Sequence, residues 1–142
     1  RGSNLKRVPF VWLLGQEILA RSLLANLTRG VGERSLERRF LKTLRLLQRA
    51  SLPWARAQAG LLEAQHAVVR DRRDQAAASF AEAQRRFDQL DMAFHAAAAR
   101  WRLAELRNDP PHSSVEPFLG RQDLPNLPRL VRMVAPIGCN GT

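Results

Sequence analysis

The stretch that decides the fold is residues 64–87, AQHAVVRDRRDQAAASFAEAQRRF. A charged run at residues 70–74 separates a part rich in Ala and Val from a part that carries two Phe residues. Phe80, Ala83 and Phe87 follow one another at spacings of three and four, which places them on one face of a helix. The stretch therefore predicts two helices joined by a tight charged turn.

The same apolar period continues on both sides of this stretch, and small aliphatic residues dominate it over β-branched and aromatic ones. No segment alternates as a strand does, so the predicted fold class is all-α. The predicted helices are Pro9 to about Thr28, Ser35 to about Ser51, Pro53 to about Arg70, Asp74 to Leu90, Met92 to about Arg107, Val115 to Gln122 and Pro128 to Val134.

Length and composition limit the domain organisation. The 142 residues, 45% hydrophobic and 25% charged, are sufficient for one compact domain and too few for a complete multidomain enzyme. We expect a single helical domain over residues 1–136 and a flexible tail over residues 137–142. Because the chain begins at Arg1 and not at Met, we expect it to be a piece of a larger protein.

The predicted core depends on an internal repeat in the sequence. A shift of 40 residues superposes Leu14, Trp54 and Phe94, and it also pairs Phe40 with Phe80. We therefore expect antiparallel helix hairpins over residues 9–50, 54–90 and 92–134, with these aromatic residues buried. On the first helix, the expected core stripe is Phe10, Leu14 and Ile18, widened by Leu13 and Leu24. A second face is also expected to be buried, and it consists of Val11, Trp12, Leu19 and Leu23.

The hairpin resembles the second half of a tetratricopeptide repeat. In that family a small residue, here Ala64, packs against an early Ala of the next helix, here Ala76, and Phe80 fills the space where the helices diverge. The resemblance implies a solenoid of about two and a half repeats. Asp71 stands where Gly is common, and a spacing of 40 exceeds the usual 34, so a HEAT-like helical array remains an alternative.

Over residues 9–136 the chain is similar to the C-terminal region of large bacterial signalling proteins that contain a serine/threonine protein kinase domain and an AAA-type ATPase module. The Ala-rich segment Phe94–Leu106 and the ending Pro128–Pro136 carry this resemblance. It implies a cytoplasmic, non-catalytic protein-protein interaction or regulatory scaffold. Its partners would be a protein, a peptide or other domains of the same chain.

No constellation of residues predicts catalysis. The sequence has no phosphate-binding Gly-rich loop and no kinase motif. Asp91 and His95 share a helix face without a third ligand, and Cys139 is the only cysteine. We therefore expect no catalytic residue, no cofactor and no metal. The apolar run at residues 8–15 is too short to span a membrane.

The net charge of +10 raises a second functional class, a module that binds nucleic acid or another polyanion. The positive charge is nearly all Arg, which a GC-rich genome would also produce. One helix face carries four cations at spacings of four, three and four, which could neutralise several phosphates. No aromatic side chains that could stack on bases lie between them, so a face that is simply solvated is the competing interpretation. The members of this predicted polyanion stripe are Arg38, Lys42, Arg45 and Arg49.

For the scaffold hypothesis, partner contacts are expected from polar residues on the first helix of each pair, because these helices line the concave side of such arrays. The candidate partner-binding residues are Gln58, Glu63, Gln65, His95, Arg102 and Glu105.

Overall fold

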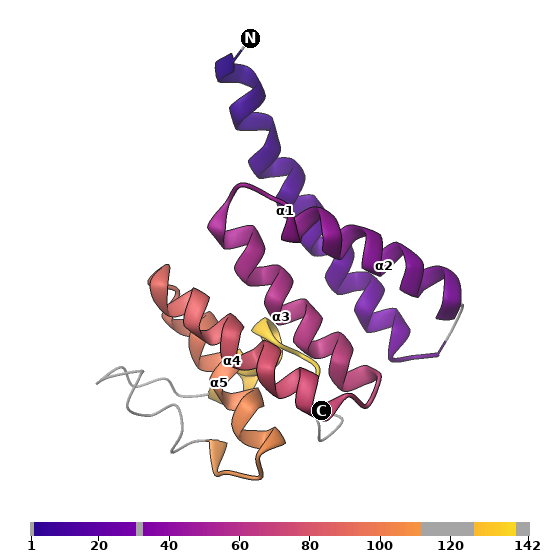
Figure 1. The fold of residues 1–142 in the computed structure, drawn as a ribbon, viewed down its shortest axis with the longest axis vertical. Helices are drawn as coiled ribbons and strands as arrows, with labels where there is room; N and C mark the ends of the chain where they lie inside the picture. Colours follow the sequence, from indigo (N-terminus) through magenta and orange to yellow (C-terminus); the bar gives the residue numbers. More distant parts are fainter. Residues whose placement is uncertain (1, 31–32, 112–126, 139–142) are drawn as a thin grey trace. The chain divides into compact units, whose positions relative to one another are not determined.

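The structure is a computed structural model, and it describes residues 2–30, 33–111 and 127–138 (Figure 1). These ranges contain helices and no strand, so the predicted all-α class is confirmed for the described part of the chain. None of the described helices is long and apolar enough to cross a membrane. The helices are α1 (Gly2–Leu27), α2 (Glu33–Gln48), α3 (Pro53–Val69), α4 (Arg73–Gln89), α5 (Ala93–Leu106) and α7 (Leu127–Val134).

The helix boundaries lie close to the predicted ones, with one exception. Helix α1 begins at Gly2 and runs through Pro9, the residue at which the sequence predicts its start. Proline within a helix removes one backbone donor without always ending the helix. The short helix predicted over Val115–Gln122 lies outside the described residues.

The chain divides into two compact units, Arg1–Leu62 and Glu63–Thr142, and the division falls within α3. In the first unit α1 packs against α2. In the second unit α4 lies beside α5, and α5 also contacts α7, the yellow helix of Figure 1. The tetratricopeptide-like arrangement of hairpins remains a prediction.

In the first unit, helix α1 buries only part of the predicted stripe. Leu13 and Leu24, which widen that stripe, are buried, whereas Phe10, Leu14 and Ile18 are exposed by 51%, 38% and 57%. The prediction is therefore confirmed at Leu13 and Leu24 and wrong at the other three positions. Helix α1 carries apolar residues on more than one face, and a period of 3.6 residues does not say which face a neighbour covers.

The second face predicted for α1 is covered only in part. Leu23 is buried and Leu19 is half-buried, but Val11 and Trp12 are exposed. The covered residues lie in the later turns of α1, so burial changes along the helix as well as around it.

The aromatic anchors predicted from the repeat differ in their burial. Phe80 is completely buried, which confirms its place in the core, and Trp54 is half-buried with its ring 5.9 Å from that of Phe10. Phe94, by contrast, is 47% exposed, so its predicted burial was wrong. Phe94 is the second residue of α5, and it precedes the nearly continuous buried stretch that begins at Ala96.

Helices α4 and α5 are also joined at their ends. The Arg73 guanidinium, in the first turn of α4, donates from Nε and Nη2 to the carbonyl oxygen of Leu106, at 3.2 and 2.6 Å. Leu106 is the last residue of α5, where backbone carbonyls lack helical partners. A cation at this position satisfies a free acceptor and interacts favourably with the helix dipole.

Candidate polypeptide-binding site

Arg102 is the most deeply buried cation among the described residues, with 2% of its surface exposed. It lies on α5, and its guanidinium makes bonds in three directions. Nε donates to the carbonyl oxygen of Ala135 at 2.8 Å, and Nη2 donates to that of Pro136 at 3.2 Å. A buried charge destabilises a protein unless it is paired and hydrogen-bonded. The partners of Arg102 therefore offset the cost of burying its guanidinium.

Glu105 supplies the counter-charge from the next turn of the same helix. Its Oε1 accepts a hydrogen bond from Nη1 of Arg102 at 2.8 Å, and its side chain is only 9% exposed. The spacing of three residues places both groups on one face of α5. The ion pair therefore orients the guanidinium so that Nε and Nη2 can donate to two successive carbonyl oxygens.

Gln65, on α3, completes the arrangement. Its Oε1 accepts a hydrogen bond from the backbone N–H of Ile137 at 3.2 Å, and the residue is 2% exposed. We call Gln65, Arg102 and Glu105 the backbone clamp, because Arg102 donates hydrogen bonds to main-chain atoms of the segment Ala135–Gly138 and Gln65 accepts one from them. Gln65 thus recognises an N–H group, while Arg102 recognises carbonyl groups.

The segment Ala135–Gly138 suits this clamp by its own chemistry. Helix α7 ends at Val134, and the N–H of Ala135 still donates to the carbonyl oxygen of Val131 at 2.7 Å. Pro136 has no N–H to satisfy, and the residue before a proline is biased toward extended backbone. The chain can therefore leave α7 without an unsatisfied donor at Pro136.

Space at the clamp admits only small side chains at two positions. Ala135 is completely buried. A Cβ atom at Gly138 would lie 2.8 Å from Cζ of Arg102 and 2.9 Å from Oε1 of Glu105, and closer still to Nη1 of Arg102. The guanidinium and the carboxylate are fixed by their hydrogen bonds, so neither could move aside without losing some of these bonds.

The clamp brings together three of the six predicted partner-binding residues, Gln65, Arg102 and Glu105, and all three lie in the second unit. Their polar groups hold a segment of the same chain. The sequence places Ile137 and Gly138 in a flexible tail, whereas the structure places them against the clamp. Residues 139–142 lie outside the described residues.

The other three predicted partner-binding residues are not part of the clamp. Gln58 is buried and belongs to the first unit, and Glu63 is half-buried on α3. His95 is half-buried, with its ring 5.1 Å from that of Phe87. Aromatic packing therefore accounts for the position of this histidine.

The predicted polyanion stripe lies on the outer side of α2 and at its end. Arg38, Lys42, Arg45 and Arg49 are all exposed, opposite the buried Phe40. Nε of Arg45 donates to the carbonyl oxygen of Leu41 at 3.3 Å, within the same helix. The four cations are thus accessible to a large anionic partner.

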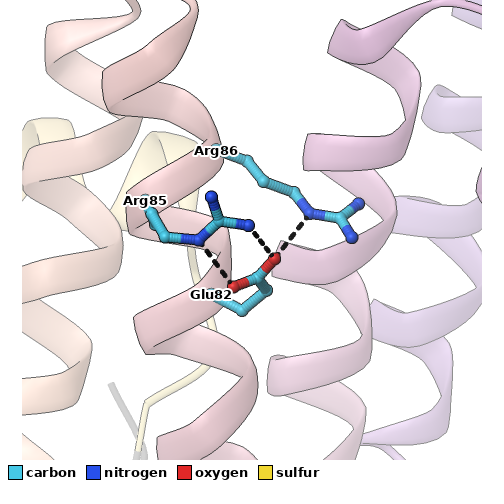
Figure 2. Close-up of polar contacts among 3 residues, drawn as sticks. All are labelled: Glu82, Arg85 and Arg86. Carbon is cyan, nitrogen blue, oxygen red and sulfur yellow. Dashed lines mark hydrogen bonds and ion pairs between the residues drawn. The ribbon is translucent and has the colours of Figure 1, made fainter.

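A second charged cluster, on α4, consists of two surface ion pairs that share Glu82 (Figure 2). Glu82 accepts hydrogen bonds from Nε and Nη2 of Arg85 at 2.9 and 2.5 Å, and from Nε of Arg86 at 3.0 Å. These hydrogen bonds lower the pKa of Glu82 to about 2. Because the side chains of Glu82 and Arg85 are 44% and 56% exposed, solvent screens the pair and it contributes little to stability.

The described residues include no group of three or more His, Cys, Asp or Glu side chains that could hold a metal ion. Compared with models of protein families, with curated proteins and with solved structures, the chain matches none. The assignment of function therefore depends on the geometry of the clamp and of α2.

Proposed function

We propose that this chain is a non-catalytic helical module that binds polypeptide, acting as a protein-protein interaction or regulatory scaffold. The observation that carries the proposal is the backbone clamp. It presents two donors for backbone carbonyls and one acceptor for a backbone N–H to a non-helical segment, and none of these hydrogen bonds involves a side chain of that segment.

The physical argument is that backbone recognition is the means by which a rigid surface holds an extended chain. Main-chain hydrogen bonds supply affinity, and pockets for particular side chains supply specificity. The clamp has both features, since Ala135 is completely buried and a Cβ atom at Gly138 would clash with Arg102 and Glu105. The resemblance to the C-terminal regions of bacterial signalling proteins supports a place for such a module in a larger protein.

The proposal is tested by selecting peptides against the full chain. A library of random displayed peptides would be panned, and recovered peptides titrated by fluorescence polarisation. We expect Arg102→Gln to weaken binding by about tenfold or more, since hydrogen bonds from a charged donor contribute ~1.5–3 kcal/mol. Arg107→Gln is the matched control, because Arg107 is an exposed residue at the end of the same helix.

Loss of one partner of a buried ion pair destabilises proteins by ~3–5 kcal/mol, so circular dichroism must show that Arg102→Gln folds. If it does not, Gln65→Met removes the acceptor for a backbone N–H while keeping a side chain of similar shape. Recovery of no peptide, or equal binding by all variants, would contradict the proposal.

A second candidate function is polyanion binding by α2, which the exposure of Arg38, Lys42, Arg45 and Arg49 supports. With a labelled oligonucleotide, the logarithm of the binding constant should fall linearly with the logarithm of the salt concentration. Arg38→Gln with Arg45→Gln should flatten that slope by ~0.7–0.9 for each phosphate that is no longer neutralised.

The matched control for the polyanion test is Arg56→Gln with Arg107→Gln, which removes the same charge from exposed positions outside α2. Equal slopes for the two double variants would mean that net charge, and not α2, determines the binding.

A further inference from the structure

The occupant of the backbone clamp is a segment of the same chain, and it is held mainly by features that another polypeptide could reproduce. Arg102 donates to the carbonyls of Ala135 and Pro136, and Gln65 accepts from the N–H of Ile137. No side-chain polar group of the segment contributes, because these residues have none. This inference rests on the proposed function, that the clamp binds polypeptide.

The space around the segment defines a pattern for the occupant. The first position is completely buried and accepts Ala, and the fourth position tolerates no Cβ atom. Between them, Pro136 is exposed and Ile137 is half-buried, so these positions are less restricted. A proline at the second position favours the extended backbone and removes a donor that the clamp does not pair.

Charge adds a further restriction. Arg102 is already neutralised by Glu105, at 2.8 Å, so the clamp does not require an anionic partner. A neutral segment leaves this ion pair undisturbed, because it brings no charge that competes for either partner. The clamp therefore suits a neutral segment of the form small residue–Pro–apolar residue–Gly.

We propose that a separate polypeptide with this small residue–Pro–apolar residue–Gly pattern binds the backbone clamp, and that the chain's own segment Ala135–Gly138 competes with it as a tethered inhibitor. The segment then limits binding to partners present at sufficient concentration or with better flanking contacts.

Tethering explains why the resident segment competes well. The segment directly follows α7, which contacts α5, the helix that carries Arg102, so it acts at a high effective concentration. If the site is free for only about a tenth of the time, the apparent dissociation constant of a separate peptide rises about tenfold. Freeing the clamp should therefore increase peptide affinity without changing any residue of the clamp.

The test uses the full chain and a fluorescent peptide with the sequence of residues 131–142, VRMVAPIGCNGT, in which Cys139 is replaced by Ser for labelling. Gly138→Val in the protein would place side-chain atoms against Arg102 and Glu105 and so displace the resident segment. We expect the Gly138→Val protein to bind the probe at least about tenfold more tightly than the wild type. A probe carrying Gly138→Val should bind neither protein.

Amide hydrogen exchange at Ile137 reports whether the resident segment has left the clamp. Ala135→Glu, which would bury a charge, is a second variant that displaces the segment should Gly138→Val fail to fold. Retained protection of the Ile137 N–H in both variants would overturn the proposal, because the contacts at Ala135 and Gly138 would then not hold the segment in place.

The remaining outcomes separate the two proposals. If peptides selected on the wild type bind, but displacement of the segment leaves their affinity and that of the probe unchanged, the inference falls and the proposed function stands. If no peptide binds any folded variant, both fall. If light scattering shows that the wild type forms dimers by exchanging the segment, a second copy is the occupant and the inference also falls.

Discussion

Asp71, Asp91 and Asn108 follow the helices α3, α4 and α5, and all three have the left-handed backbone, with φ of 56°, 56° and 58°. After each, the next residue's N–H returns to a carbonyl in the last turn, as from Met92 to Phe87 at 2.9 Å. This bonding pattern ends a helix sharply and is most favourable with Gly at the left-handed position. The connections are therefore short, at the expense of backbone strain.

Replacement of Asp91 by Gly should relieve this strain. We expect the free energy of unfolding to rise by ~1 kcal/mol, because a left-handed conformation costs a non-glycine residue about that amount. Thermal unfolding followed by circular dichroism measures the change. Asp91→Ala is the control: it removes the same charge but keeps a Cβ atom, and an equal gain from it would show that charge, not backbone strain, is responsible.

In helix α1, burial changes the pKa of an acidic residue. Glu17 lies on the face of α1 that is buried, with 6% exposed, and burial raises its pKa above 4.5 while the Arg21 guanidinium, at 3.6 Å, opposes that shift. A folded-state pKa above the unfolded one means that the folded protein binds the proton more tightly. The ionised carboxylate therefore destabilises the folded state at neutral pH.

Glu17→Gln should raise the free energy of unfolding at pH 7 by ~1 kcal/mol, within the range of stabilising substitutions. The sign follows from linkage: the penalty is absent below pH 4.5, where both states are protonated, and it grows as the pH rises through the folded-state pKa. Unfolding temperatures measured at about pH 7 and about pH 3 should thus differ between the two proteins only at the higher pH. A lower unfolding temperature for Glu17→Gln at neutral pH would contradict this account.

For the whole molecule, the second unit is built on a core of small residues around a few large rings. Phe80 and Phe87 on α4 are completely buried, and Ala96–Ala99 on α5 are buried with them. Methyl side chains allow helices to approach closely, so each large ring fills space that no neighbour can fill in its place. Stability is therefore concentrated in few residues.

Phe80→Ala should lower the free energy of unfolding by ~3–5 kcal/mol, as expected for a buried Phe. Phe94→Ala removes the same ring from an exposed position and should change it by at most ~0.5 kcal/mol. Urea unfolding of both variants provides the comparison. Similar losses in the two proteins would mean that the assigned core of the second unit is incorrect.

Much of the fold was accessible from the apolar period. Apolar residues recur at spacings of three and four throughout, and charged turns such as residues 70–74 interrupt this pattern. The pattern predicts helices well because the hydrogen bonds of a helix join residues that are close in sequence. The class of the fold, the order of the described helices and the burial of Phe80 and Phe87 follow from that pattern. Of the candidate site, the sequence indicated Gln65, Arg102 and Glu105 as polar residues on helices, without indicating what they hold.

Contacts between distant parts of the chain determine which helix faces are buried and which polar groups meet, and the apolar period does not. Two apolar faces of α1 look alike in sequence, and contact with α2 in the first unit selects the face with Leu13 and Leu24 over that with Ile18. Likewise, nothing local joins Arg102 to Ala135, which lies 33 residues further along the chain. Burial and hydrogen bonding between distant residues depend on how elements meet, and that information does not reside in the spacing of neighbouring residues.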